Sequence, residues 1–457
     1  MLSSASIPRS RALNAPAPFL CPAGSLIQCR HKSKASTAKQ MIAKIRAKER
    51  KEVEKAAGGR IFRPLPAARN LNAVFDADQP EELILPTFSP LKGIDEIKGE
   101  LTPQDAGKAF SLPYRENDPC RKFGVPRNLV LDFRLLAKPA TIIRDVTMTM
   151  FQNLQRASNE VSNAHSYVLY GEPGCGKSYT LLQCAEWAHG LEWLVLYIPR
   201  ATQAITLVNS STPYQYDIRT MTYAQPGYAA QILTRFLTVN EKLLNRIKTI
   251  GNVHLDESTK LPSGTSYAEL IRVSLQRPSV VPSALWVILE ELGKQIDYPV
   301  MLAVDDFQAL FCTSKYRDPM FHGIKAWHLS IPRLLLEYFS GRKSFKRGAV
   351  VGALSTSNTT FNLSPQVRHA LGIQPELGVD PFTTIAPEIR MYTKGIRAVE
   401  VPGQLGYNEA ASMFEVWMKN KTLHTRENDD LFLSKYTESG GNPREFVWQG
   451  LLNTLQT

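Results

Sequence analysis

The 457-residue sequence has few cysteines and lacks any long apolar run. Its six cysteines are scattered, without a Cys-x-x-Cys pair or a histidine at metal-ligand spacing, which argues against a disulfide scaffold and a structural zinc site. The densest apolar patches, 193–198 and 283–289, are far shorter than the roughly 18 residues that cross a bilayer, so an integral membrane protein is excluded. A hydrophobic share of 43% predicts a folded chain.

Acidic residues are missing from the first 48 positions. Residues 1–60 contain thirteen basic and three acidic side chains, whereas the other 397 residues contain 41 and 39, so the net charge of +12 belongs mainly to an N-terminal arm. The Ser- and Arg-rich, acid-free composition of residues 1–30 is typical of a mitochondrial transit peptide, and we expect cleavage near Arg30. The alternative is a disordered basic tail.

Composition divides the rest of the chain into four parts. Residues 31–60 form a basic arm with a highly charged helix at 36–57, which is either solvated or bound to a polyanion. Residues 61–125 are an extended Pro-rich segment, and the folded domain is expected to begin after it, at 126–400, with an insertion at about 209–297. Residues 401–457 form a small helical lid, with Asn408 as the expected cap of its first helix.

A phosphate-binding signature lies near the middle of the chain. Helical spacing begins around residue 141, an apolar strand is expected at 167–170, and a helix is expected from Ser178 to about His189. Between strand and helix the sequence matches G-x-x-x-x-G-K-[ST], the P-loop pattern, in the context that this pattern requires. The candidate nucleotide-binding residues are Gly171, Glu172, Pro173, Gly174, Cys175, Gly176, Lys177, Ser178 and the following Tyr179.

The residue types of this loop suit phosphate chemistry. Its glycines allow the backbone to turn successive N–H groups toward an anion, and the helix adds the positive end of its dipole. Lys177 would supply a charge to the β- and γ-phosphates, and Ser178 would place a hydroxyl on Mg²⁺.

A second apolar run, 299–304, ends in two acids. Asp305 is the acid expected to lie beside the metal ion. Hydrolytic P-loop proteins commonly carry a glutamate at the next position to polarise the attacking water, but this chain has the shorter Asp306. Because a base misplaced by about an ångström costs on the order of a hundredfold in rate, Asp306 is a doubtful catalytic base.

Two further segments are candidates for sensing the nucleotide. The run 348–354 ends in Ser355, Thr356, Ser357 and Asn358, where a polar side chain either contacts the γ-phosphate or only forms a turn. Near the C-terminus, Arg444 follows Gly-Gly-Asn-Pro and either contacts the nucleotide or belongs to an ordinary helix cap.

Alternating strands and helices predict an α/β fold of the P-loop NTPase type, a parallel sheet flanked by helices, with the ligand at the carboxyl ends of the strands. The guanine-reading pattern Asn-Lys-x-Asp is absent, since Asn420-Lys421-Thr422-Leu423 lacks the carboxylate. The motifs alone therefore leave the base open, and ATP is not excluded.

Several segments together resemble the death-associated protein three family, the P-loop component of the mitochondrial ribosomal small subunit. They are YVLYGEPGCGKS, WLVLYIP, FLTVNEKLLNRI at 236–247, MLAVDDFQALF, GALSTS and Asp380-Pro381-Phe382. The resemblance covers roughly residues 120–457.

This resemblance implies an AAA-like fold, binding of GTP or GDP with Mg²⁺, and residence in the mitochondrial matrix as part of the small subunit. It also implies contacts with small-subunit ribosomal RNA and neighbouring ribosomal proteins, and a contact with the large subunit across the intersubunit face. Two classes of function follow: a structural component with a bound nucleotide and slow or no hydrolysis, or an active NTPase that drives ribosome assembly or remodelling. Asp306 in place of glutamate favours the first.

Overall fold

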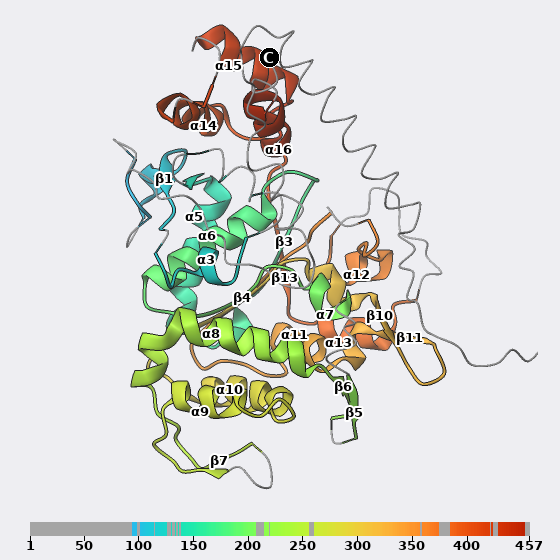
Figure 1. Cartoon of the computed structure of the whole chain (residues 1–457). Coiled ribbons are helices and arrows are strands. Elements are labelled where there is room, and N and C mark those ends of the chain that lie inside the picture. The colour runs from blue at the N-terminus through green and yellow to red at the C-terminus, as the bar shows by residue number, and fades with distance from the viewer. Residues whose placement is uncertain are drawn as a thin grey trace, which may run out of the picture. The chain divides into compact units, whose positions relative to one another are not determined.

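A computed structural model describes most of the chain after residue 93 (Figure 1). The described residues are 94–452 without 98–100, 114, 126–128, 130–132, 134–135, 137–138, 207–213, 219, 256–259, 357–358, 374–383, 421 and 424–427. The expected transit peptide, the basic arm and positions 61–93 of the Pro-rich segment lie outside these residues, as do Ser357, Asn358 and Asp380-Pro381-Phe382.

A parallel five-stranded sheet forms the centre of the described chain. Its strands are β3 (Ser166–Tyr170), β4 (Leu194–Ile198), β9 (Val300–Val304), β12 (Gly348–Ala353) and β13 (Arg397–Glu400). They are ordered β13-β3-β12-β9-β4, so β12 separates the strand before the loop at 171–178 from the strand before Asp305. All residues of β4, β9 and β12 are buried, as expected for parallel strands covered on both faces. The predicted α/β class is confirmed.

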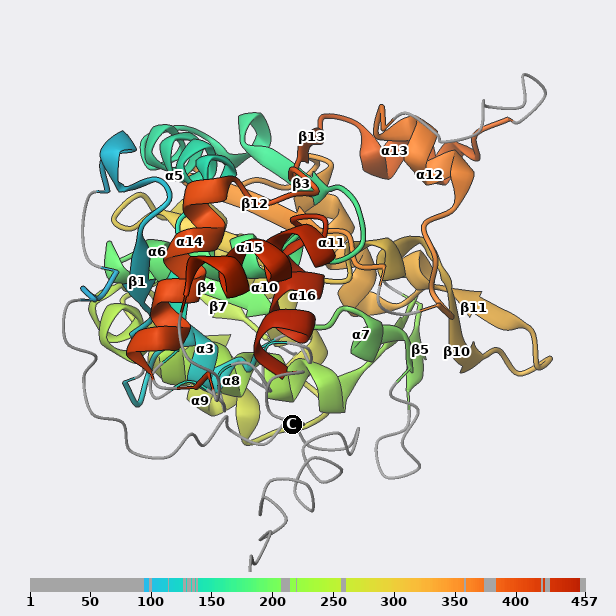
Figure 2. The same cartoon turned by 90° about the horizontal axis from the view of Figure 1, so that it is seen from above.

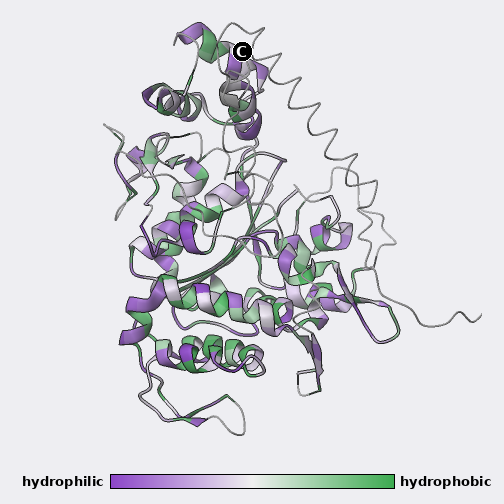
Figure 3. Cartoon of the chain, in the orientation of Figure 1, coloured by the Kyte–Doolittle hydropathy of each residue, from purple (hydrophilic) through white to green (hydrophobic). Residues whose placement is uncertain are grey.

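Helices cover both faces of this sheet. Figure 1 shows α5 and α6 on one side and α11 and α13 on the other. The longest, α8, buries residues at three- and four-residue spacing, among them Ile232, Phe236 and Val239. Figure 3 accordingly shows hydrophilic and hydrophobic residues alternating along the helices. The helices up to the last strand are α3 (Pro119–Lys122), α5 (Asp145–Ala157), α6 (Lys177–Gly190), α7 (Thr202–Thr206), α8 (Pro226–Arg246), α9 (Tyr267–Leu275), α10 (Val281–Lys294), α11 (Ser330–Phe339), α12 (Pro365–Ala370) and α13 (Pro387–Thr393).

In the part of the chain that the structure describes, four two-stranded sheets lie outside the central sheet. They are β1 (Ala109–Ser111) with β2 (Ala140–Ile142), β5 (Gln215–Asp217) with β6 (Thr222–Ala224), β7 (Val253–His254) with β8 (Lys260–Leu261), and β10 (Thr313–Arg317) with β11 (Gly323–Lys325). Short 3-10 turns occur at Pro103–Asp105, Ser162–Ala164, Phe307–Phe311 and Ala326–His328. None of the helices among the described residues is long and apolar enough to span a membrane.

The end of the Pro-rich segment is part of the folded body. Strand β1 pairs with β2, and Leu112, Cys120 and Phe123 are buried in the main core. The helical spacing around residue 141 is only partly realised, because Ile142 belongs to β2 and α5 begins at Asp145. The first residues of the helical pattern instead form strand β2, because residues 140–142 pair with β1.

The C-terminal helices have a core of their own. Helices α14 (Tyr407–Lys419), α15 (Asp429–Glu438), α16 (Pro443–Phe446) and a π-helical turn (Val447–Leu452) bury Phe414, Trp417, Phe432 and Phe446 against residues of β2. Figure 1 shows these helices at the top of the view, and Figure 2 shows them in front of the strands of the sheet. Asn408 does not cap α14: Gly406 precedes the helix, and the Glu409 carboxylate accepts a hydrogen bond from the Gly406 N–H at 2.9 Å.

Candidate functional site

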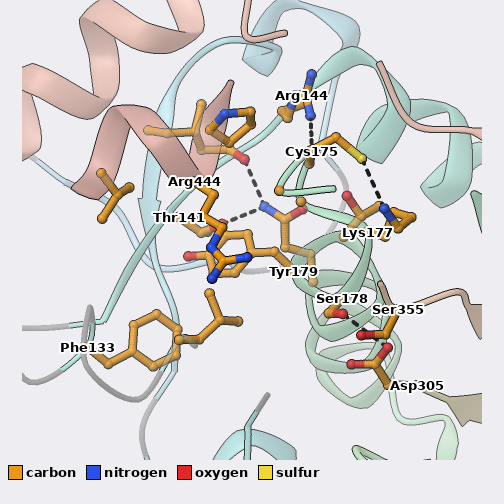
Figure 4. A pocket seen from close by; sticks show the side chains of 18 of the residues that line it. Phe133, Thr141, Arg144, Cys175, Lys177, Ser178, Tyr179, Asp305, Ser355 and Arg444 are labelled. Atoms are coloured by element: carbon orange, nitrogen blue, oxygen red, sulfur yellow. Dashed lines mark hydrogen bonds between the residues drawn. The ribbon is translucent and has the colours of Figure 1, made fainter. Parts of the chain in front are cut away.

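A cleft of about 800 Å³ opens at the carboxyl ends of β3, β4, β9 and β12. Its floor contains the loop at 171–178 and the two acids after β9, and its far wall is made by the C-terminal helices (Figure 4). The sequence-predicted residues that line the cleft are Gly174, Cys175, Gly176, Lys177, Ser178, Tyr179, Asp305, Asp306, Ser355, Thr356 and Arg444. Gly171, Glu172 and Pro173 begin the loop but do not line the cleft.

The loop has the backbone that its glycines predict. Gly171, Gly174 and Gly176 have φ of +150°, +82° and +98°, a region that side chains disfavour. The carbonyl oxygens of Pro173 and Cys175 accept hydrogen bonds from the Asn442 amide at 2.9 Å and the Arg144 guanidinium at 2.7 Å. In a trans peptide the N–H lies opposite the C=O, so the amides of Gly174 and Gly176 point away from these partners.

Lys177 and Ser178 begin α6 at the bottom of the cleft. The Lys177 ammonium is buried and donates to the carbonyl oxygens of Gly171 at 2.9 Å and Glu172 at 2.6 Å. The Ser178 hydroxyl donates to the Asp305 carboxylate at 3.0 Å, and Figure 4 shows the two side chains facing each other. The fold therefore joins two motif residues that are 127 positions apart in the sequence.

The two acids have different surroundings. Burial, and then repulsion by the Asp306 carboxylate, raises the pKa of Asp305 to about 8. Burial also raises the pKa of Asp306, while hydrogen bonds from Thr202 and Ser355 and the charge of Arg200 act in the opposite direction. A cation placed beside Asp305 would favour its ionised form again.

Asp306 is held by structural contacts. Its backbone is left-handed, with φ of +56°, and its carboxylate accepts a hydrogen bond from the Thr202 hydroxyl at 2.9 Å. Thr202 lies at the start of α7, after β4, and the sequence patterns did not single it out. The carboxylate of Asp306 is thus tied to the neighbouring element, which restrains it from reorienting toward a water.

The C-terminal segment contacts the loop in two ways. Asn442 caps α16 by accepting from the amides of Arg444 at 3.1 Å and Glu445 at 3.4 Å, so the capping interpretation of this segment is correct. The Arg444 side chain also lines the cleft and lies 5.7 Å from the centre of the Trp448 ring, while its backbone N–H donates to the Gly174 oxygen at 3.3 Å.

Arg144 is a residue of the site that sequence reasoning missed. Its buried guanidinium donates to the oxygens of Cys175 at 2.7 Å, Pro402 at 3.1 Å and Gln404 at 2.8 Å, and pairs with Glu409 at 3.2 Å. One side chain therefore joins the loop, the strand-to-lid connection and α14. Its sequence surroundings carry no recognisable signal for this role, because the partners lie up to 265 positions away.

One end of the cleft is apolar and aromatic. The Tyr179 ring lies 6.2 Å from that of Phe133, and its hydroxyl donates to the Ala140 oxygen at 2.6 Å. The other apolar residues of this end come from the segment before β2 and from the C-terminal helices: Leu129, Leu136, Met413, Val416, Trp417, Val447 and Trp448. Flat aromatic and aliphatic surfaces beside a glycine-rich loop could accommodate a planar ring.

Among the described residues, no group of three or more His, Cys, Asp and Glu side chains is arranged to bind a metal ion. Mg²⁺ does not require such a group, because it usually keeps several waters and takes one or two protein oxygens besides phosphate oxygens. The adjacent oxygens of Ser178 and Asp305 fit that requirement.

Fold and site together define an α/β protein with a glycine-rich loop and paired acids in a cleft beneath a C-terminal helical layer. Residues 141–449 match the family described as mitochondrial ribosomal death-associated protein 3, and the chain belongs to this family. The resemblance expected from the sequence motifs is thereby confirmed.

Curated relatives match most of the chain. The small ribosomal subunit protein mS29 of Schizosaccharomyces pombe is 25% identical over 347 residues, which cover 74% of this chain and 70% of that protein. The proteins of the same name from Neurospora crassa and Bos taurus are 24% and 25% identical, over 77% and 72% of this chain and 76% and 81% of their own lengths.

Proposed function

We propose that this chain is a component of the small subunit of the mitochondrial ribosome, in the matrix, and that it binds a guanine nucleotide with Mg²⁺ at the loop 171–178. Family membership and the relatives named mS29 support the ribosomal role. The guanine base is proposed from the family resemblance, since no base-specific motif is present.

The observation that carries the nucleotide proposal is the contact between Ser178 and Asp305 beneath a loop in which the carbonyls of Pro173 and Cys175 bond to partners outside the loop. This arrangement leaves loop amides for phosphate oxygens, the Lys177 ammonium for their charge, and a hydroxyl and a carboxylate for Mg²⁺. The cation would neutralise phosphate charge when bound. The Lys177 bonds to Gly171 and Glu172 would be exchanged for bonds to phosphate.

The strand order supports an AAA-like arrangement of this site. Strand β12 lies between β3 and β9, so its polar end at Ser355 and Thr356 stands between the loop and the acids. Helix α16 covers the loop through Asn442 and Arg444. We assign Ser355 and Arg444 to the phosphate end of the ligand and Tyr179 and Phe133 to its base end.

Hydrolysis is expected to be slow or absent. The bond from Thr202 holds the Asp306 carboxylate in place, and an aspartate is shorter than the glutamate of hydrolytic P-loop proteins. The nucleotide would then act as a bound cofactor that stabilises the fold by mass action. Multiple turnovers by the purified protein would instead favour the alternative of an active NTPase that drives assembly or remodelling.

Substitution of Lys177 tests the loop assignment. We expect Lys177→Ala to lower the affinity for GTP and GDP with Mg²⁺ at least tenfold, because a charged hydrogen bond to phosphate is lost. Isothermal titration with GTP, GDP and ATP measures affinity and base preference together. The matched control is Lys343→Ala, since the Lys343 ammonium lies over the Trp286 ring, away from the loop. Unchanged affinity in Lys177→Ala would contradict the proposal.

The ribosomal partners follow from the same proposal. We propose contacts with small-subunit ribosomal RNA and neighbouring ribosomal proteins, and with the large subunit across the intersubunit face. The basic segment 36–57, which lies outside the described residues, is our first candidate for electrostatic RNA binding.

A further inference from the structure

Two hairpins, β5–β6 and β10–β11, project from the same side of the molecule in both views (Figures 1 and 2). The start of β5–β6 contacts the far end of β10: the Tyr214 ring packs edge-on against the Tyr316 ring at 4.9 Å, and the Tyr214 hydroxyl donates to the Arg317 oxygen at 2.6 Å. The two hairpins are therefore held against each other.

The tip of β10–β11 is a bonded turn that exposes apolar side chains. The Asp318 carboxylate accepts from the amides of Met320 at 2.9 Å and His322 at 2.7 Å, and the Phe321 N–H donates to the Asp318 oxygen at 2.9 Å. The side chains of Met320 and Phe321 are nonetheless 78% and 83% exposed. The turn is thus ordered by its own hydrogen bonds, without any burial of these two side chains.

Phe321 is unfavourable for the isolated fold in two respects. Its φ of +65° lies in the left-handed region, where glycine would be preferred, and its ring remains in water. Met221 repeats this combination on β5–β6, with φ of +50° and 67% exposure. A side chain that costs backbone strain and contributes no core packing indicates a contact with another molecule.

The charged residues near Phe321 indicate the chemical class of the molecule that would bind there. The charged residues of β10 and β11 are Lys315, Arg317 and Lys325, all exposed and all basic. Two acids lie near them: Asp318, whose carboxylate accepts hydrogen bonds from amides of its own turn, and Asp217 at the end of β5. A second exposed aromatic residue, Tyr216 on β5, is 54% exposed. Aromatic rings that can stack on bases, set beside cations that can pair with phosphates, are the combination used to bind single-stranded nucleic acid.

We propose that Tyr216, Lys315, Arg317, Phe321 and Lys325, here called the hairpin surface, bind an unpaired segment of RNA. Phe321 stacks on a base, and the three cations contact the backbone phosphates on either side. This inference rests on the proposed ribosomal function and adds to it a contact on the folded body, separate from the basic segment 36–57.

The first test uses the full chain with a labelled single-stranded polyuridine RNA and fluorescence anisotropy. Phe321→Gly relieves the backbone strain, so the variant is expected to fold at least as well, yet to bind RNA about tenfold more weakly. Phe321→Tyr keeps a stacking ring and should retain affinity. Ile296→Ala is the control, because Ile296 is also an exposed apolar residue but lies elsewhere. Equal affinity of the glycine and tyrosine variants would overturn the proposal.

Ultraviolet cross-linking in native small subunits provides the second test. We expect ribosomal RNA nucleotides on the peptide that contains Phe321. Cross-links on the N-terminal arm with none on this peptide, or attachment of the tip to an acidic protein only, would overturn the hairpin proposal and leave the ribosomal role intact. Absence of the chain from small subunits would instead refute the proposed function itself.

Discussion

Glu186 is a buried carboxyl group that takes no part in the proposed function. It lies on α6, where its carboxylate accepts from the Cys120 N–H at 2.6 Å, and its second oxygen is buried without a hydrogen-bond partner. Burial, and then repulsion by Asp118, raises the pKa of Glu186 to about 8. The folded protein therefore keeps this group protonated at pH values where the unfolded chain has lost the proton.

The pH dependence of stability follows from this shift. Between the ordinary pKa of 4.5 and the folded value of about 8, the folded state binds one more proton than the unfolded state, so stability falls as pH rises. The slope from this group is up to about 1.4 kcal/mol per pH unit. Glu186→Gln should flatten the dependence of the unfolding free energy between pH 5 and pH 7.5, measured by urea denaturation.

The control for this substitution is Glu290→Gln, at an exposed position of α10. It should leave the slope of the wild-type protein unchanged. A Glu186→Gln protein with the wild-type slope would show that the carboxyl group is ionised in the folded state and would refute its proposed protonation.

Single residues also show where sequence reasoning is strong. Lys177, Ser178 and Asp305 were predicted because each lies in a local pattern, a glycine-rich loop or an apolar run that ends in acid, and the structure brings the last two to 3.0 Å. Arg144 was missed because its function depends on partners in distant segments. A contact formed only by tertiary packing leaves no periodicity or spacing in the sequence.

Among the elements, the loop 171–178 and the start of helix α16 are in close contact. A Cβ atom added to Gly174 would lie 2.5 Å from the Asn442 side-chain oxygen and 2.9 Å from the Arg444 Cβ. The glycine is therefore required both by its φ of +82° and by the close approach of α16.

Gly174→Ala should consequently separate α16 from the loop. We expect a destabilisation of about 1–3 kcal/mol, because backbone strain and overpacking act together. Thermal denaturation measures the loss, and hydrogen exchange should show faster exchange in α16 than in the central sheet. Gly190→Ala is the matched control, since nothing lies within 4 Å of an added Cβ there, and it should be neutral or slightly stabilising. Equal stability of both variants would argue against a tight contact.

Some elements could be predicted from the sequence and others could not, for a physical reason. Strands β9 and β12 followed from the buried apolar runs 299–304 and 348–354. The β1–β2 pair was missed, because β1 is a three-residue strand in a Pro-rich segment and is fixed only by its pairing with residues 140–142. Short strands gain their stability from the partner strand and not from their own sequence.

At the scale of the whole molecule, the basic charge is concentrated in one part of the sequence. The net charge of +12 is concentrated in residues 1–60, outside the described part of the chain, and the remaining sequence is almost neutral. Under the proposed function, nucleotide phosphate would be recognised by a few buried groups such as Lys177, whereas RNA phosphate would be recognised by exposed basic residues. Only the second interaction should weaken strongly with salt.

We propose that the mitochondrial ribosomal role of the family is accompanied by a nucleotide held at the loop 171–178. Small subunits purified from mitochondria can be extracted and their nucleotides identified and counted by chromatography, in cells that carry either the wild-type chain or Lys177→Ala. The account predicts about one guanine nucleotide per wild-type chain and its loss with the substitution. Wild-type subunits without nucleotide, or a nucleotide content that Lys177→Ala leaves unchanged, would contradict it.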